Sequence, residues 1–368
     1  MTRVAIAHDW LTGMRGGERV LEHLLDLFPD AELFTLIHVA RTVSARIEAR
    51  PIHTSFVNKL PGVRRWYRYY LPLFPRAIER LDLRGFDLVL SISHCVAKGV
   101  RVANGTHICY CLTPMRYAWD RYDDYFGPGR AGPLMRVAAP TVIRRLRRWD
   151  VNTTSRVDRF VTISKHIQGK IARFYGRQSH VVYPPVDTRR FRPDRARDSF
   201  YLVVSALVPY KRVDIAIEAF RGTHRKLVIV GHGPELDMLR RRAPENVTLL
   251  GWRRDDEVAD LMERCRALVF PGEEDFGLVP IEAQAAGAPV IALGSGGVLE
   301  TVIAANGGNG DGNREPTGIV FDGPDPLALR EALDRFERGR FDPRAARASA
   351  ERFSISSFNE GIRSAIPD

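Results

Sequence analysis

Short apolar runs alternate with amphipathic and turn-rich segments along almost the whole chain. Runs such as 4–8 (VAIAH) and 267–270 (ALVF) are almost continuously apolar, which is typical of parallel strands buried on both faces. Many of these runs precede a helical pattern, one of which begins near Glu18. The alternation predicts parallel βαβ units. Buried strands are expected at 4–8, 87–91, 107–111, 159–163, 181–183, 200–205, 226–231, 247–250, 267–270, 289–292 and 318–321.

The chain of 368 residues is too long for a single compact core and suits two domains. A Pro- and Arg-rich stretch at 183–193 is the expected hinge between them. We predict an N-terminal domain over 1–185 and a second domain over 186–345. A helical segment at 346–368 is expected to return to the first domain. The fold class is therefore α/β, with two Rossmann-like domains that face each other across a cleft.

The positive charge is concentrated in the first half of the chain. Residues 1–185 contain 29 Lys and Arg against 15 Asp and Glu, whereas residues 186–368 contain 26 against 29, for a total of +11. The N-terminal domain is therefore expected to meet an anionic partner. No stretch of 18 apolar residues or signal-peptide pattern occurs, and the four cysteines fit no zinc spacing. These observations predict a cytoplasmic protein with buried, reduced thiols.

The stretch at 270–286 is the strongest candidate for a binding site. A buried run is followed by a loop and then by a helical segment that a Gly-Ala-Pro sequence closes. Glu274 lies in the loop and Glu282 lies in the helix. The backbone at Phe276, Gly277, Leu278 and Val279 is suited to a phosphate, because the first amides of a helix have no partner within it. The alternative is that both carboxylates are ordinary helix residues favoured by solvent and the helix dipole.

Three further features are expected at the same kind of position, where a strand ends. Lys211 and Arg212 place two cations before a helix and would match a pyrophosphate, although a basic pair on a helix flank is equally common. Gly231 and Gly233 form one tight turn, and Gly16 and Gly17 form another. Each glycine turn alone is weak evidence, because such pairs are often only turns.

Taken together, these motifs resemble those of the retaining glycosyltransferases of family 4, which have the GT-B fold. The resemblance covers nearly the whole chain, and its order and spacing are specific. Within that family it is strongest to bacterial mannosyltransferases of O-antigen and exopolysaccharide assembly. The motifs are Gly16–Arg19, Ser93-His94 with Ala97–Gly99, Thr113–Trp119, Tyr183–Asp187, Lys211, Gly231-x-Gly233-Pro234, Glu274-x7-Glu282, and Gly296-Gly297 with Glu300.

The resemblance implies a role for each residue. Glu274 would hold hydroxyls of the donor sugar, and Glu282 would hold the ribose of the nucleotide. Lys211, helped by Arg212, would stabilise the leaving diphosphate, as would the amides of the two glycine-led helix starts. The segment with Trp252 would contact the base. The family also implies that no enzymic nucleophile is needed, because the leaving phosphate takes the acceptor's proton.

Two positions depart from the family pattern. Ala206 stands where many relatives have Arg, and Arg212 could supply that charge. Leu112 stands where many relatives have His, so that histidine's role cannot be transferred to this chain. His8 and His94 could substitute for it, although a structural role is the more common one for a histidine at such a position.

The resemblance therefore implies a hexosyltransferase, with mannose from GDP-mannose as the expected donor and a lipid-linked saccharide as the expected acceptor. No cofactor or metal is expected, because no Asp-x-Asp motif lies in a loop and cations can neutralise the diphosphate.

Segment 59–80, which has six Lys and Arg, one Glu and several aromatics, is expected to dock peripherally on an anionic membrane, at the inner face of the cell membrane. A nucleotide-sugar epimerase of the same fold and a nucleic-acid-binding protein are the alternatives. Nucleic acid is not an expected partner, because the charge is confined to one half.

Overall fold

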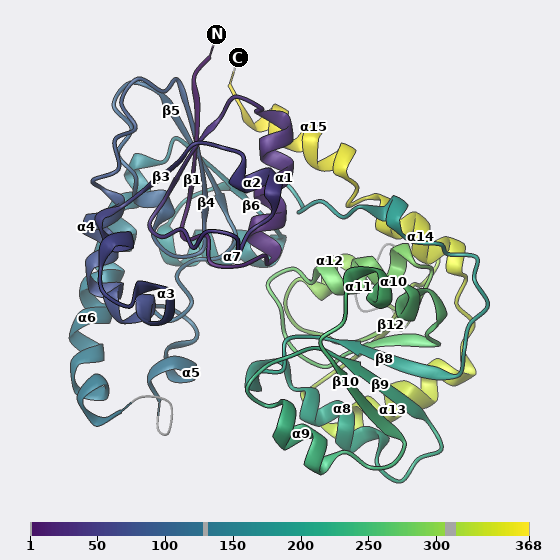
Figure 1. The fold of residues 1–368 in the computed structure, drawn as a ribbon. Helices are drawn as coiled ribbons and strands as arrows, with labels where there is room; N and C mark the ends of the chain where they lie inside the picture. Colours follow the sequence, from purple (N-terminus) through teal and green to yellow (C-terminus); the bar gives the residue numbers. More distant parts are fainter. Residues whose placement is uncertain (1, 128–131, 306–313, 368) are drawn as a thin grey trace. The chain divides into compact units, whose positions relative to one another are not determined.

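Two parallel sheets, one in each half of the chain, organise the protein (Figure 1). The computed structural model describes residues 2–127, 132–305 and 314–367. The N-terminal unit extends to Pro184 and also includes the segment from Phe358 onwards, whereas the C-terminal unit comprises Pro185–Ser357. Each unit is a Rossmann-like arrangement of helices on a parallel sheet, so the predicted α/β class is confirmed.

The sheet of the N-terminal unit has the order β3-β2-β1-β4-β5-β6-β7. The sequence pattern did not predict β2 and β3. Both are short, and polar residues such as Glu32 and His53 interrupt their apolar pattern. The strands are β1 (Val4–His8), β2 (Glu32–Thr35), β3 (Ile52–Thr54), β4 (Leu88–Ser93), β5 (Thr106–Cys111), β6 (Arg159–Thr162) and β7 (Ser179–Val181).

Helices cover both faces of this sheet. Alternate residues of β1 point to opposite faces, so Ala5 and Ala7 pack in the core that also contains Phe74 and Ile143. Figure 1 shows α3, α4 and α6 on that side and α1 and α15 on the other. The helices are α1 (Gly16–Leu27), α2 (Ala45–Glu48), α3 (Val63–Trp66), α4 (Phe74–Ile78), α5 (Tyr122–Phe126), α6 (Pro133–Asn152) and α7 (Lys165–Tyr175), with 3₁₀ turns including η2 (Tyr67–Leu73) and η3 (Ala97–Gly99).

Helix α15 (Ile355–Ala365) joins the N-terminal unit through its apolar face. The Phe358 ring lies 5.9 Å from that of Tyr110, and Arg159 donates a hydrogen bond of 2.7 Å to the carbonyl of Ala365. The C-terminal segment that belongs to the N-terminal unit begins at Phe358, whereas the sequence analysis expected it to begin at residue 346. The preceding helix α14 (Pro343–Glu351) packs on the C-terminal unit instead, where Arg347 donates to the Ala285 carbonyl at 3.1 Å.

The sheet of the C-terminal unit has the order β10-β9-β8-β11-β12-β13, and the sequence pattern predicted all six strands. Figure 1 shows α8, α9 and α13 on one face and α10, α11, α12 and α14 on the other. The strands are β8 (Phe200–Val204), β9 (Lys226–Val230), β10 (Val247–Gly251), β11 (Ala267–Phe270), β12 (Val290–Leu293) and β13 (Gly318–Phe321). The helices are α8 (Val213–Phe220), α9 (Leu236–Arg242), α10 (Asp255–Arg264), α11 (Leu278–Ala285), α12 (Val298–Thr301) and α13 (Pro326–Arg338).

All four cysteines are buried and free, as the sequence predicted. Within the described part of the chain, no helix combines the length and the apolar character that crossing a membrane requires.

One buried histidine makes the stability of the N-terminal unit depend on pH. His107 is fully buried, with Nε2 2.8 Å from the Ser91 hydroxyl and Nδ1 2.9 Å from the Arg156 carbonyl. Burial lowers the pKa of His107 from 6.5 to about 4. The unfolded chain therefore binds a proton that the folded chain excludes. The resulting stability is complete above pH 6.5 and is lost as the pH falls towards 4.

We expect His107→Gln to reduce this pH dependence. The single histidine accounts for a loss on the order of 3 kcal/mol between the two pKa values. Urea unfolding followed across this pH range should show a shallower loss of stability in the variant than in the parent. His53→Gln, which changes an exposed histidine, is the matched control. An unchanged pH profile in His107→Gln would contradict the assignment.

Candidate functional site

The carboxyl ends of β8 and β11 form the point at which the strand order of the C-terminal sheet reverses. β8 pairs with β9 on one side and with β11 on the other. Ligands of open α/β sheets bind at such switch points, because the loops that follow the two strands diverge there. Here the loops are 205–212 and 271–277.

Lys211 and Glu274 meet at this point although 63 positions separate them in the sequence. Lys211 Nζ donates a hydrogen bond to Glu274 Oε1 in an ion pair, with the two side chains 12% and 29% exposed. The structure therefore brings together two residues that the sequence analysis singled out separately. Lysine has three donors and a carboxylate has two oxygens, so the pair retains capacity to bind a further polar ligand.

Glycines allow the backbones of neighbouring loops to touch around this ion pair. A Cβ at Gly272 would lie 2.7 Å from the Lys211 carbonyl oxygen, so only glycine fits there. Gly297, in the loop after β12, donates its amide to the Glu274 carbonyl at 2.8 Å. A Cβ at Gly297 would overlap the Cα of Phe276. The loops after β8, β11 and β12 are thus layered on one another.

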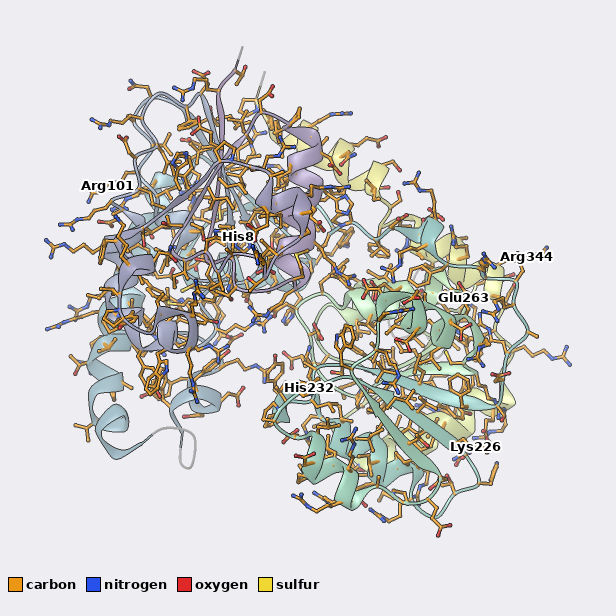
Figure 2. The ribbon with its side chains drawn as sticks, in the orientation of Figure 1. His8, Arg101, Lys226, His232, Glu263 and Arg344 are labelled. Atoms are coloured by element: carbon orange, nitrogen blue, oxygen red, sulfur yellow. The ribbon has the colours of Figure 1, made fainter. Side chains whose placement is uncertain are left out.

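Gly231 and Gly233 have a packing role that the sequence analysis did not foresee. A Cβ on either residue would overlap a carbonyl oxygen of the loop after β8, that of Ser205 for Gly231 and that of Leu207 for Gly233. Contact between loops is therefore sufficient to explain the glycine motif. Contact of these glycines with a ligand stays a prediction. His232, which stands between the two glycines in the sequence and is labelled in Figure 2, is exposed.

Helix α11 begins directly after the Glu274 loop. Gly277 has φ +90° and precedes Leu278 and Val279, which are the first two helical residues and are partly exposed. Glu282 stands one turn after Leu278 on the same helix face. The Phe276 ring is buried against Phe353 at 5.6 Å, so its side chain serves the core. Any contact of Phe276 with a ligand would have to come from its backbone.

Arg212, the second cation of the predicted pair, contacts a carboxylate on the helix that follows it. Its guanidinium Nε and NH2 lie 3.2 and 3.3 Å from the two carboxylate oxygens of Asp214. Arg212 also has φ +51°, a left-handed conformation that costs a non-glycine residue about 1 kcal/mol. These contacts place Arg212 at the start of α8, and its contact with a diphosphate stays a prediction.

Trp252 follows β10 and is 69% exposed, which leaves its indole available at the surface. Ala206, which replaces the family's arginine, is also exposed. Among the described residues, no group of three or more His, Cys, Asp or Glu side chains is placed to hold a metal ion.

The N-terminal sheet has a corresponding switch point at the ends of β1 and β4, and its central residue is Asp9. Asp9 is fully buried, and its carboxylate accepts four backbone hydrogen bonds of 2.6–2.9 Å from residues 94–97. This carboxylate ties the loop after β4 to the end of β1. The sequence analysis missed Asp9, although a lone acidic residue directly after an apolar strand was a visible signal.

Gly16 and Gly17 open helix α1, next to His8 and Leu112. A Cβ at Gly17 would lie 3.3 Å from His8 Nε2 and 3.0 Å from the Leu112 side chain. His8 is buried, with Nδ1 3.1 Å from the Trp10 carbonyl, and burial lowers its pKa to about 4. Figure 2 shows His8 in the interior of the N-terminal unit. Its neutral ring is thus part of the packing beneath the glycine turn.

Residues 187–353 match the family model "Glycosyl transferases group 1". This segment coincides closely with the C-terminal unit and contains both Lys211 and Glu274. The match to glycosyltransferases therefore falls on the C-terminal unit.

Curated proteins with similar sequences are glycosyltransferases of several specificities. The chain is 33% identical over 155 residues to an uncharacterized glycosyltransferase of Methanocaldococcus jannaschii, covering 41% of this chain and 44% of that protein. It is 35% identical over 193 residues to the GDP-mannose-dependent alpha-(1-6)-phosphatidylinositol monomannoside mannosyltransferase of Mycobacterium tuberculosis, covering 44% and 48%. The chain thus spans less than half the length of these relatives.

Solved structures resemble the chain over almost its full length. Anabaena HepE in complex with UDP superposes with a TM-score of 0.69 at 16% identity and 99% coverage of both chains. WaaG, a glycosyltransferase involved in lipopolysaccharide biosynthesis, gives a TM-score of 0.64 at 16% identity and 98% coverage of both. At this identity the likeness establishes the fold, which is GT-B.

We expect Gly297→Ala to destabilise the C-terminal unit by about 1–3 kcal/mol, because the added methyl group would displace the backbone of the Glu274 loop. Thermal unfolding measures the change. Gly169→Ala in α7 is the matched control, since a Cβ there meets nothing within 4 Å. Equal melting temperatures for Gly297→Ala and the parent would show that the loops are not layered in this way.

Proposed function

We propose that this chain, which has a GT-B fold and whose C-terminal unit matches the model of group 1 glycosyl transferases, is a hexosyltransferase that uses a nucleotide-sugar donor. In finer detail, we propose a retaining enzyme of family 4 that transfers mannose from GDP-mannose to a saccharide in surface polysaccharide biosynthesis. The mannosyl specificity is supported by the mycobacterial relative, whose name specifies GDP-mannose. The matched relatives also include a D-rhamnosyltransferase and a glycogen synthase, so the donor needs a direct test.

The observation that carries the proposal is the Lys211–Glu274 ion pair at the start of α11. A nucleotide sugar has an anionic diphosphate and a polyhydroxyl ring side by side. A cation paired with a carboxylate, next to the first amides of a helix, offers complementary groups for both parts. We assign Lys211 and the backbone at Gly277–Val279 to the diphosphate, Glu274 to the sugar hydroxyls, and Glu282 to the ribose.

The proposed reaction places developing charge on these groups. The bond between the anomeric carbon and the phosphate oxygen breaks, and its electron pair leaves with the nucleoside diphosphate. The acceptor hydroxyl oxygen bonds to the anomeric carbon, and its proton passes to the leaving phosphate. Lys211 stabilises the diphosphate more strongly as its charge grows, which lowers the barrier.

The ion pair also gives the Lys211 ammonium group a partner before the donor binds. Glu274 neutralises the ammonium group of Lys211 at a partly buried position, where an unpaired cation would be costly. When a diphosphate binds, Lys211 can turn to the phosphate oxygens and Glu274 to the sugar. In this proposal Lys211 supplies the charge that a metal ion would otherwise provide, so the reaction is metal-independent.

A donor screen tests the proposal. GDP-, UDP-, ADP- and dTDP-hexoses are added to the protein in EDTA, and thermal stabilisation and release of nucleoside diphosphate are measured. A ligand present at about 100 times its dissociation constant stabilises by roughly 2.7 kcal/mol, which is easily detected. Stabilisation by GDP-mannose above the others supports the mannosyl assignment. Interconversion of the sugar nucleotide without transfer would indicate the epimerase alternative.

We expect Glu274→Gln to lower turnover about a hundredfold or more, roughly 2.7 kcal/mol, because an amide cannot accept hydroxyl hydrogen bonds at both positions. Lys211→Ala should have an effect of similar size. The melting temperature of Glu274→Gln should fall only slightly, because the amide oxygen can still accept a hydrogen bond from Lys211. Arg195→Ala, which breaks the ion pair with Asp260 in the same unit, is the control and should retain full turnover. Normal turnover in Glu274→Gln would remove this residue from the site.

For the acceptor we propose a lipid-linked saccharide, presented to the N-terminal unit at the inner face of the cell membrane. The supporting feature is the membrane-facing segment, defined here as residues 63–80, which comprises α3, η2, α4 and the residues up to Arg80. Its inner side is held by Val63, Tyr67, Phe74, Ala77 and Ile78, which are buried. Trp66, Tyr69 and Leu73 are 52%, 65% and 39% exposed on its outer side.

Basic side chains surround these exposed aromatics. None of the arginines of the segment pairs with a carboxylate in the part of the chain that the structure describes. They are Arg64, Arg65, Arg68, Arg76 and Arg80, all exposed. Aromatics at headgroup depth and cations on anionic lipid favour a bilayer surface. At about 1 kcal/mol per cation, five arginines provide at most roughly 5 kcal/mol, which suits reversible docking.

We expect Arg64→Glu/Arg65→Glu to weaken binding to phosphatidylglycerol vesicles at least about tenfold at low salt. Co-sedimentation measures the effect, and donor binding should be unchanged. Arg240→Glu/Arg241→Glu, which reverses an adjacent exposed pair on α9, is the matched control and should bind vesicles like the parent. If the parent protein ignores anionic vesicles, the basic N-terminal unit serves a soluble anionic acceptor instead.

A further inference from the structure

His94 lies at the switch point of the N-terminal sheet, directly after β4 and beside the end of β1. Strands β1 and β4 are paired along their full length, from Val4–Leu88 to His8–Ile92. The side chain of His94 is 29% exposed, whereas Asp9 beneath it is fully buried. A polar ring is therefore presented at the position where an open α/β sheet binds its ligand.

Contacts within the unit fix the orientation of the His94 ring. Its Nδ1 is buried and lies 3.1 Å from Asp9 Oδ2 without the alignment of a hydrogen bond, while its backbone amide donates to the same oxygen at 2.7 Å. The edge of Trp10 packs on the imidazole with 4.5 Å between ring centroids. Because Nδ1 is buried, the exposed edge of the ring is the one that carries Nε2.

Burial and the surrounding charges determine the protonation state of the His94 ring. Burial, together with Arg116 and Arg15, lowers the pKa of His94, and Asp9 opposes this shift. The neighbouring His8 is itself neutral and buried. A neutral His94 has one proton, and the Asp9 carboxylate favours that proton on Nδ1. Its Nε2 then has a free lone pair directed to the surface.

We propose that His94 binds the acceptor saccharide, its Nε2 accepting a hydrogen bond from a sugar hydroxyl. This inference rests on the proposed function and names a residue of its acceptor site. His94 acts here as a binding and specificity residue that is positioned by Asp9. Asp9 itself is enclosed by four amides and has no exposed surface for a ligand.

The packing of Trp10 supports a lipid-linked acceptor at this place. The Trp10 ring lies 4.5 Å from His94 on one side and 5.4 and 6.1 Å from Tyr67 and Phe74. Tyr67 and Phe74 are the buried anchors of the membrane-facing segment. One aromatic side chain therefore connects His94 with the segment that we propose to touch the bilayer. A saccharide attached to a membrane lipid would have only a short distance to reach His94.

The test separates acceptor binding from donor binding. Labelled hexose is transferred from the donor selected by the screen to a total lipid extract of the source organism. Dissociation of the donor and its slow hydrolysis by water are measured in parallel. We expect His94→Ala to raise the apparent KM for the lipid extract about tenfold or more, as loss of a directed hydrogen bond does. Donor affinity and hydrolysis should stay within about twofold of the parent, because the donor residues are untouched.

Two further variants keep the outcome interpretable. His94→Gln should restore part of the transfer, since its amide oxygen can accept the same hydrogen bond. His53→Ala, at an exposed histidine paired with Glu32, should behave like the parent. Normal transfer by His94→Ala would overturn this inference alone. Failure of the parent protein to transfer any hexose to lipid would overturn the proposed acceptor and this inference together. The parallel measurement of donor dissociation would still test the proposed donor site on its own.

Discussion

Both units depend on contacts between the loop that follows their first strand and the loop that follows their fourth. In a sheet whose order reverses at the first strand, these loops begin side by side and then diverge. The N-terminal unit joins them with the Asp9 carboxylate, which accepts four amides of residues 94–97. The C-terminal unit joins them with the Lys211–Glu274 ion pair. The same topological constraint is thus met by a buried carboxylate that backbone amides surround in one unit and by a partly exposed ion pair in the other.

This difference fits the proposal that the N-terminal unit binds the acceptor and the C-terminal unit binds the donor. The buried Asp9 carboxylate accepts four amides and lies beside His94 Nδ1, so it holds the two loops together and orients the neutral His94 ring. Lys211 and Glu274 remain partly exposed and exchangeable, so they can engage an ionic ligand. Leu112 contributes to the contrast, because it packs beside Gly17 and His8 and makes this corner of the N-terminal unit less polar than the family pattern suggests.

The architecture could be read from the sequence because continuous apolar runs mark parallel strands in both halves. Only the short β2 and β3 escaped the pattern. Single residues were harder to interpret, since a motif does not say which neighbour a side chain meets. Gly231 and Gly233 were assigned to a ligand, yet overlap with carbonyl oxygens already requires glycine there. Arg212 was predicted to help with a diphosphate, and the residue spacing did not indicate its ion pair with Asp214. Such local partners depend on loop geometry, which residue spacing does not encode.

Helix α15 makes the N-terminal unit discontinuous in sequence. The chain leaves this unit after Pro184, builds the whole C-terminal unit, and only then supplies Phe358 and the residues that follow. During synthesis, therefore, the ring of Tyr110 and the end of β7 near Val182 stay uncovered until the second unit has been translated. The first unit to be made is consequently the last to be completed. A fragment ending at residue 184 would lack part of its own apolar cover, whereas residues 185–357 form a continuous folding unit.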